Sequence, residues 1–192
     1  APPGQPANFS MRGFTSNQIT ILRDGIWLGP ASMTGRPQNG FNLGRVELLK
    51  GPASVLYGQG AIAGTLNMVT KQPIEGDPGS VELLTSYGRY DTVKLGAGVG
   101  RPLGDNLWLR ADVSHYRSNG YVDNADPRSS NATGSILWKP NNKLSMTFSV
   151  DFLQDKLQNY WGTPLVSGAF GTQPLRGVVK TTDGRTIDAR TR

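Results

Sequence analysis

The sequence predicts a mainly β fold, and three observations support this prediction. Glycine and proline account for 25 and 13 of the 192 residues, which interrupts the chain too often for a helix bundle, a coiled coil or a helical solenoid. From Gly79 onward, apolar and polar residues alternate with a period of two, the pattern of strands with one apolar face. Apolar runs are short and the mean hydropathy is −0.37, which excludes a transmembrane helix but leaves alternating transmembrane strands possible.

The clearest local signal in residues 1–78 is the pair Asp24-Gly25, which lies between the apolar runs 19–23 and 26–28. Both residue types tolerate the positive φ angles that a two-residue hairpin turn requires. The sequence therefore predicts a β-hairpin over residues 19–28.

Two more strands and a short helix are expected in the same part of the chain. Residues 45–50 and 61–70 have the apolar and β-branched content of strands. Between them, Pro52 and Gly58 stand where a helix of about one and a half turns would begin and end, because proline suits the first helical position and glycine the position past the end.

Five segments with a period of two follow Gly79 and are expected to pair as consecutive antiparallel strands. In the last segment the apolar residues share one face, and polar residues occupy the other. Each segment is about ten residues long, the length of a tilted strand that crosses a bilayer. The five segments are residues 79–88, 91–101, 106–116, 131–139 and 143–153. The apolar face of the last one comprises Leu144, Met146, Phe148, Val150 and Phe152.

The connections between these segments alternate in length. Residues 88–91, 103–106 and 140–142 form tight turns, whereas residues 118–130 and everything after Gln154 are long and polar. The turns at 103–106 and 140–142 are expected on one side and the long loops on the other. Outer-membrane barrels have short turns on one side of the membrane and long loops on the other. A soluble β-sandwich with one solvated face also alternates, so periodicity alone leaves both architectures open.

The remaining motifs support no enzyme, no resident metal or cofactor, and no nucleic-acid partner. The chain has no cysteine and one histidine, His115, so thiolate chemistry and a histidine-rich metal centre are excluded. Gly58, Gly60 and Gly64 lie between an expected helix and a strand, the reverse of the order that dinucleotide binding requires. The net charge is +6, but lysine and arginine are scattered singly, unlike the basic runs of nucleic-acid-binding surfaces.

Three motifs give the chain a specific resemblance. They are NFSMRGF at residues 8–14, LRDG at 22–25 and, above all, RVELLKGPASVLYGQGAIAGTLNMVTKQP at 45–73. These motifs resemble the plug domain of TonB-dependent outer-membrane receptors, most closely the siderophore branch, and residues 79–155 resemble the first strands of the barrel that follows the plug. The chain departs from the family pattern at Gly44, where glutamate is usual, and at Ala63, where glycine is common.

The resemblance implies an incomplete architecture within this chain. Residues 1–78 are expected to be part of the plug, and residues 79–192 to be the N-terminal part of a transmembrane β-barrel of the 22-stranded class, ending in an extracellular loop. We expect the signal peptide, the TonB box, the first part of the plug and about seventeen strands to lie outside the chain. Trp138 is expected in the aromatic belt on the periplasmic side.

The resemblance also implies a function. The full-length protein is expected to be a monomeric receptor in the bacterial outer membrane, embedded in its lipid, that binds a ferric siderophore and imports it with energy from the TonB protein. No bond is made or broken, so no enzyme activity and no cofactor are expected. The alternatives are uptake of another bulky nutrient, such as a cobalamin or an oligosaccharide, and a structural or adhesive barrel that transports nothing.

The resemblance points to residues that contact the ligand. A ferric chelate is bulky and often anionic, so aromatic faces and arginine suit it. Arg12 is expected beside the hairpin at residues 19–28, with Trp27 next to it. Trp27 as a plug core residue, or Arg12 paired with a barrel carboxylate, would instead be structural. The candidate ligand-binding residues are Arg12, Trp27, Leu28, Gly29 and Phe41 in the plug and Tyr160 and Trp161 in the last loop.

Overall fold

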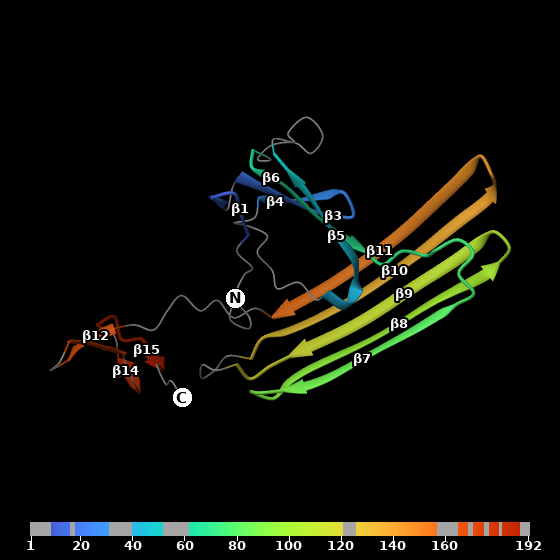
Figure 1. The fold of residues 1–192 in the computed structure, drawn as a ribbon. Coiled ribbons are helices and arrows are strands. Elements are labelled where there is room, and N and C mark those ends of the chain that lie inside the picture. The colour runs from blue at the N-terminus through green and yellow to red at the C-terminus, as the bar shows by residue number, and fades with distance from the viewer. Residues whose placement is uncertain are drawn as a thin grey trace.

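The computed structural model consists mainly of strands. It describes residues 9–15, 18–30, 40–51, 62–120, 126–156, 165–168, 171–174, 177–180 and 182–188. Two sheets dominate, a small one of N-terminal strands and a large one that lies below and to the right of it in Figure 1. The short strands are β1 (Ser10–Met11), β2 (Phe14–Thr15), β12 (Leu165–Gly168), β13 (Gly171–Pro174), β14 (Val178–Lys180) and β15 (Thr186–Asp188).

The small sheet has four strands in the order β4-β3-β6-β5. The predicted hairpin is confirmed, since β3 and β4 pair antiparallel and Asp24 and Gly25 have φ angles of 49° and 78°. The predicted strands at 45–50 and 61–70 are also present, as β5 and β6, whereas the helix expected between Pro52 and Gly58 lies outside the described residues. The strands are β3 (Ile19–Arg23), β4 (Ile26–Pro30), β5 (Leu43–Lys50) and β6 (Gly64–Thr70).

The core of the small sheet is apolar and compact. Ile19, Ile21, Ala63 and Met68 are buried together, because β3 and β6 run parallel side by side. The turn at Asp24 is tied to β6, since the Asp24 carboxylate accepts hydrogen bonds from the backbone N–H and the hydroxyl of Thr70, at 2.8 and 2.9 Å. A 3-10 turn, η2 (Gly40–Asn42), leads into β5.

The large sheet has five antiparallel strands in the order β11-β10-β9-β8-β7. All five predicted segments are confirmed as consecutive strands, each within a few residues of its predicted ends. The connections at 105–106 and 142–143 are tight turns. No helix among the described residues is long and apolar enough to cross a membrane. The strands are β7 (Ser80–Gly88), β8 (Thr92–Gly104), β9 (Leu107–Arg117), β10 (Arg128–Asn141) and β11 (Leu144–Lys156).

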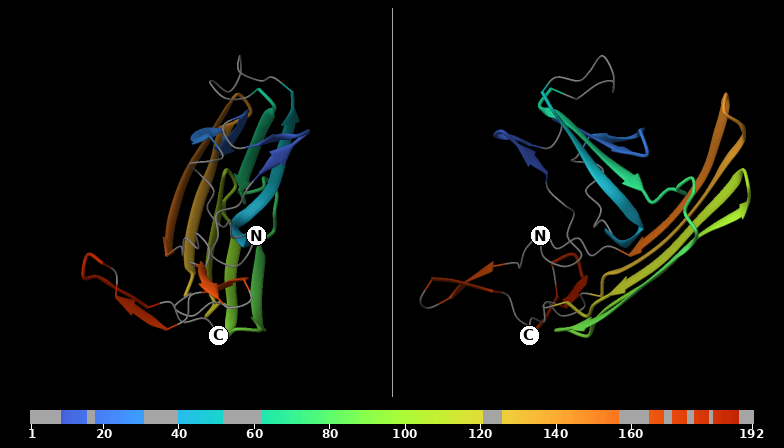
Figure 2. Two further views of the ribbon diagram at one scale, coloured as in Figure 1. Left: turned by 90° about the vertical axis from the view of Figure 1, so that its left-hand side faces the viewer. Right: turned by 45° about the vertical axis from the view of Figure 1, so that its right-hand side comes forward.

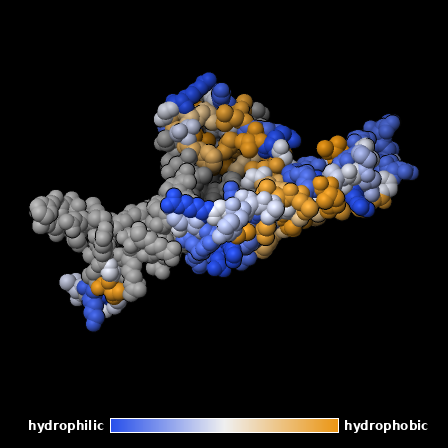
Figure 3. All heavy atoms as spheres, turned by 60° about the horizontal axis from the view of Figure 1, so that its bottom comes forward, coloured by the Kyte–Doolittle hydropathy of each residue, from blue (hydrophilic) through white to orange (hydrophobic). Residues whose placement is uncertain are grey.

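The two faces of the large sheet differ as the alternation predicts. Phe148 and Phe152 on β11 are 68% and 62% exposed, whereas Ser149 and Asp151 on the opposite face contact Gln72 and Arg23 of the N-terminal part. The small sheet therefore lies against the polar face (Figure 2). The apolar side chains form a band along the other face, with hydrophilic residues beyond both of its ends (Figure 3).

Candidate functional site

The polar face of the large sheet is where the two parts of the chain meet. Buried polar side chains occupy alternate positions on β9 and β10, and plug residues such as Arg23 and Asn42 contact them. Burying polar groups costs free energy unless they find hydrogen-bond partners, and each of these side chains except Ser129 has one. The buried polar residues of this face are Arg110, Asp112, Ser114, Ser129, Asn131, Thr133 and Ser135.

Asn42 joins the plug to the middle of this face. Its side chain is fully buried, and its Nδ2 donates to the Asp112 carbonyl at 3.0 Å and to the Thr133 hydroxyl at 3.1 Å. The Ser114 hydroxyl donates to Asn42 Oδ1. The backbone carbonyl of Asn42 accepts a hydrogen bond from the Lys71 N–H at 3.0 Å. The start of β5 and the end of β6 are therefore held together at this point of the large sheet.

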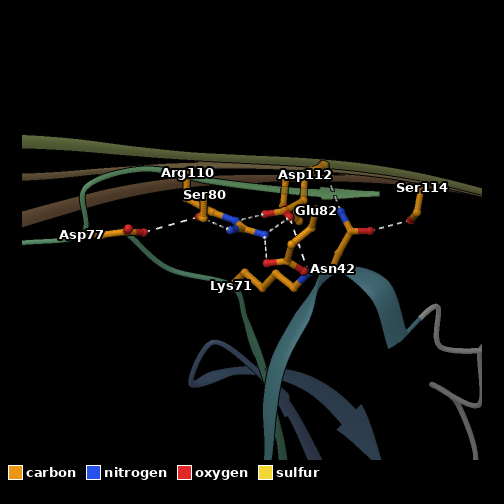
Figure 4. Close-up of polar contacts among 9 residues, drawn as sticks. Asn42, Lys71, Asp77, Ser80, Glu82, Arg110, Asp112 and Ser114 are labelled. Atoms are coloured by element: carbon orange, nitrogen blue, oxygen red, sulfur yellow. Dashed lines mark hydrogen bonds and ion pairs between the residues drawn. The ribbon is translucent and has the colours of Figure 1, made fainter. Parts of the chain in front are cut away.

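A cluster of four charged side chains lies beside Asn42 (Figure 4). Lys71, just after β6, has its Nζ 2.6 Å from Glu82 and 3.7 Å from Asp112. Arg110 donates from Nε and Nη2 to the two Asp112 oxygens at 2.8 and 2.5 Å, and from Nη2 to Glu82 at 2.8 Å. With two cations and two carboxylates the cluster is neutral. Its buried members, Arg110 and Asp112, bind each other, which offsets part of the free-energy cost of burying their charges, whereas Glu82 remains partly exposed.

Small residues on β8 create room for this cluster. A Cβ at Gly98 would overlap Asp112 Oδ1 and lie 2.8 Å from Arg110 Nη2, and a Cβ at Gly96 would lie 2.8 Å from the ring of Phe41. Lys71 in turn lies over the Phe41 ring, 4.2 Å from its centroid, in a cation–π contact. Gly98 therefore leaves room for the Arg110–Asp112 ion pair, and Gly96 lets the Phe41 side chain of the plug approach the backbone of the large sheet, called here the wall.

A second anchor lies nearer the other edge of the sheet. Arg23, at the end of β3, forms an ion pair with Asp151 on β11 and donates to Asn131 Oδ1 at 3.2 Å. The Asn131 amide donates to Asp151 at 2.7 Å, which fixes the carboxylate toward the plug. The plug is thus held at two separated points of the wall.

The candidate ligand residues lie at several places. Arg12 is exposed in the β1–β2 turn at a φ of 52°, and Trp27 and Leu28 are 53% and 44% exposed on β4. Gly29 is next along β4, and Phe41 packs against Gly96 and Lys71. Tyr160 and Trp161 lie outside the described residues.

The expectation that Arg12 adjoins Trp27 is wrong. Met11, next to Arg12, lies against Gly64, since a Cβ there would be 2.6 Å from the methionine sulfur, and Gly64 pairs with Ile19. Trp27 pairs with Leu22, near the opposite end of β3. Because the β1–β2 ribbon packs on the core at Ile19, it lies at the end of the small sheet away from the hairpin turn.

The residues that join the plug to the wall, called here the plug seat, were not identified as functional from the sequence. They are Arg23, Asn42, Lys71, Arg110 and Asp112. Arg110 and Asp112 are two positions apart on β9, so their side chains point to the same face of the sheet. The opposite face of β9 is apolar. An opposite-charge pair on the inward face was therefore a usable signal for a buried contact. Asn42 and Lys71 carry no such signal, because Asn42 binds Asp112, 70 residues away along the chain, and Lys71 pairs with Glu82 and Asp112 on two separate strands.

Comparisons with known proteins agree with this architecture. The family model described as TonB-dependent Receptor Plug Domain matches residues 1–65. The vitamin B12 transporter BtuB of Vibrio vulnificus (strain CMCP6) is 40% identical over 98 residues, covering 50% of this chain and 14% of the relative. The metal-pseudopaline receptor CntO of Pseudomonas aeruginosa PAO1 is 31% identical over 132 residues, covering 68% and 18%. The chain thus spans less than a fifth of the length of these two relatives.

A solved structure has the same fold. The pyoverdine outer membrane receptor FpvA from Pseudomonas aeruginosa PAO1, bound to pyoverdine, superposes with a TM-score of 0.68 at 23% identity, over 81% of this chain and 23% of that chain. Its likeness covers both the small sheet and the strands of the wall, which confirms the predicted combination of a plug with part of a barrel. Residues 1–65 thus match the plug domain of the TonB-dependent receptors, and the chain is similar in sequence and in fold to receptors and transporters of the bacterial outer membrane, not to enzymes.

Proposed function

We propose that the receptor to which this chain belongs captures a ferric siderophore outside the cell and imports it with energy from the TonB system. The observation that carries the proposal is the seat of the plug: Asn42, Lys71 and Arg23 bind polar groups on the inward face of the barrel wall. A barrel of the 22-stranded class has a lumen that a plug must fill, and these contacts would hold the plug in it.

The polar contacts suit a plug that must be released. Hydrogen bonds and ion pairs can be exchanged for bonds to water one at a time, each at a modest net cost in free energy. A cavity of about 510 Å³ adjoins the cluster and is lined by Gln72, Glu82 and Arg110, among others. Water entering this cavity can solvate the charges when a pull on the plug separates Lys71 from the wall.

Uptake of a cobalamin is the second candidate. The relative at 40% identity is a vitamin B12 transporter, and its match covers half of this chain. A cobalamin is a large corrinoid that binds through shape and hydrogen bonds, whereas a ferric siderophore offers iron-coordinating oxygens and often a negative charge. Arginine and exposed aromatic side chains on the plug favour the siderophore.

A binding panel on the full-length receptor tests the proposal. Quenching of tryptophan fluorescence is measured with iron-loaded hydroxamate, catecholate and mixed-ligand siderophores, with cyanocobalamin, and with the iron-free chelators. We expect saturable binding of at least one ferric siderophore and none of cyanocobalamin. Saturable binding of cyanocobalamin with no response to any ferric siderophore would instead support the second candidate.

Arg12→Ala is expected to weaken ferric-siderophore binding by about ten- to a hundredfold, since a hydrogen bond to a charged group contributes roughly 1.5–3 kcal/mol. The matched control is Arg45→Ala, another exposed plug arginine, whose guanidinium donates to Glu47 at 2.7 Å. Affinity is measured by the same quenching titration, alongside trypsin cleavage of the plug. Unchanged affinity with a plug that has become cleavable would show that Arg12 is structural.

A further inference from the structure

The outward face of the large sheet has a row of basic residues at one end. In the antiparallel register Arg128 pairs with both Arg117 and Lys156. These three residues, called here the basic row, come from β10, β9 and β11. Arg128 and Lys156 are 61% and 64% exposed, and Arg117 is exposed. In the same register, Arg117 pairs with Val93 on β8, and Val93 pairs with Tyr87 on β7.

The basic row lies at the level of lipid headgroups. At the other end of the outward face, Trp138 pairs with Leu107 and Met146. Trp138 and Arg128 are ten positions apart on β10, about 33 Å along the strand and about 25 Å along the membrane normal at a tilt of about 40°. That height matches the apolar band of an outer-membrane barrel, which has aromatic residues at both borders.

The side of the membrane follows from the connections at the two ends of the sheet. Both connections at the Trp138 end, 105–106 and 142–143, are tight turns, whereas the opposite end has one tight turn at 89–91 and the long connection 118–127. In outer-membrane barrels the short turns are periplasmic and the longer loops are extracellular. The basic row, at the opposite end, therefore faces the outer leaflet. Apolar residues fill the face between the two ends, where the band of Figure 3 runs. They include Leu109, Val113, Ile136, Phe148, Val150 and Phe152.

Three cations in direct register repel one another, and like charges opposite each other destabilise a sheet. Asp126 offsets part of this charge, since its carboxylate is 2.7 Å from Lys156 and 3.5 Å from Arg128. The hydrogen bond from Lys156 holds the pKa of Asp126 below its usual value, so the carboxylate stays charged. Two positive charges remain, and Arg117 has no ion-pair partner among the described residues.

The next row toward the membrane centre supplies further polar groups. His115 Nδ1 lies 2.9 Å from the Ser130 hydroxyl, and Gln154 pairs with Ser130 on the other side. One step deeper, Val113, Ala132 and Phe152 begin the apolar band. The order along the face is therefore cation, hydrogen-bonding group, hydrocarbon.

We propose that the basic row binds the phosphate groups of a phosphorylated lipid of the outer leaflet, with the acyl chains of that lipid lying along the apolar strands below. The planar fork of arginine matches phosphate oxygens in a bidentate fashion. A free anion would use the cations but not the adjoining apolar band, so the continuity of the two surfaces favours a lipid.

The proposal is tested on the full-length receptor in detergent, with bis-phosphorylated lipid A, the same lipid without phosphates, and inorganic phosphate as probes. Binding is followed by native mass spectrometry and by titration. We expect the phosphorylated lipid to bind at least tenfold more tightly than the dephosphorylated one. The variant Arg117→Gln with Arg128→Gln should lower that affinity about tenfold or more, since two charge-assisted contacts are lost.

The matched control removes two exposed basic residues at the other end of the sheet, Arg101→Gln with Lys143→Gln. This control should bind the phosphorylated lipid as the parent does. Equal loss in the control, or equal binding of the dephosphorylated lipid, would overturn the proposal. Full displacement of the lipid by an equal concentration of inorganic phosphate would also overturn it, by assigning the row to free anions.

Discussion

Asp112→Ala is expected to destabilise the folded receptor by about 3–5 kcal/mol, the usual cost of removing one partner from a buried ion pair. The side chain of Asp112 is 1% exposed and accepts two hydrogen bonds from Arg110, which is itself 7% exposed. Without the carboxylate, Lys71 and Arg110 share Glu82 alone, so excess positive charge is left inside the wall. Urea denaturation of the purified receptor, with tryptophan fluorescence and trypsin cleavage of the plug as readouts, measures the effect.

Two further variants test whether the lost stability comes from the buried carboxylate. Asp112→Asn keeps the volume and part of the hydrogen bonding, and should fall between the parent and Asp112→Ala. Asp105→Ala, in the exposed turn after β8, removes a carboxylate outside the cluster and should leave the unfolding midpoint unchanged. An unchanged midpoint in Asp112→Ala would show that the charged cluster does not hold the plug.

Gly98→Val is expected to cost at least about 2 kcal/mol, because overpacking alone costs about 1–3 kcal/mol and the ion pair must also move. A side chain at this position overlaps the Asp112 carboxylate and approaches Arg110 Nη2 within 2.8 Å. The same urea denaturation measures the loss. In an Asp112→Ala background the substitution should cost less, since the group it overlaps is gone, and the coupling should be about 0.5–3 kcal/mol.

Gly134→Val is the matched control for Gly98→Val. Gly134 is also a strand glycine, and a Cβ there would meet nothing within 4 Å. Its cost should therefore be small. Equal costs at Gly98 and Gly134 would mean that strand propensity, and not room for the ion pair, explains the glycine at position 98.

Turns and strands were largely predictable because they depend on residues that are adjacent in the sequence. The Asp24-Gly25 turn requires two positive φ angles, and this requirement is visible in the sequence itself. The alternation in β11 similarly predicts which residues share a face, since successive strand residues point to opposite sides. The resemblance carried by residues 45–73 then indicated which face would meet a plug.

The contacts between the two sheets were not predictable in the same way. Asn42 is one of several asparagines in the sequence, and its burial follows from the docking of η2 against β9 and β10. The relation of Arg12 to Trp27 also failed, because it depends on the end of β3 at which the β1–β2 ribbon packs. A turn signal gives no information about that choice.

A disulfide between the plug and the wall tests whether plug residues 40–42 and 71–72 are seated on the inward face of the large sheet. Phe41→Cys with Gly96→Cys suits this test, because a Cβ at Gly96 would lie 2.8 Å from Phe41 Cγ. One further bond of about 1.5 Å puts the two Cβ atoms within about 4.3 Å, the range of natural disulfides. The pair Phe41→Cys with Gly134→Cys is the control, since Gly134 lies in the outward row with Ala111.

The measurement is maleimide labelling of the full-length receptor after mild oxidation, counted by mass against the parent receptor and repeated after reduction. We expect the Phe41 and Gly96 pair to add no label when oxidised and two labels when reduced, whereas the control pair keeps a labelled thiol throughout. Two freely reactive thiols in the oxidised Phe41 and Gly96 pair would show that the plug is not seated on this wall.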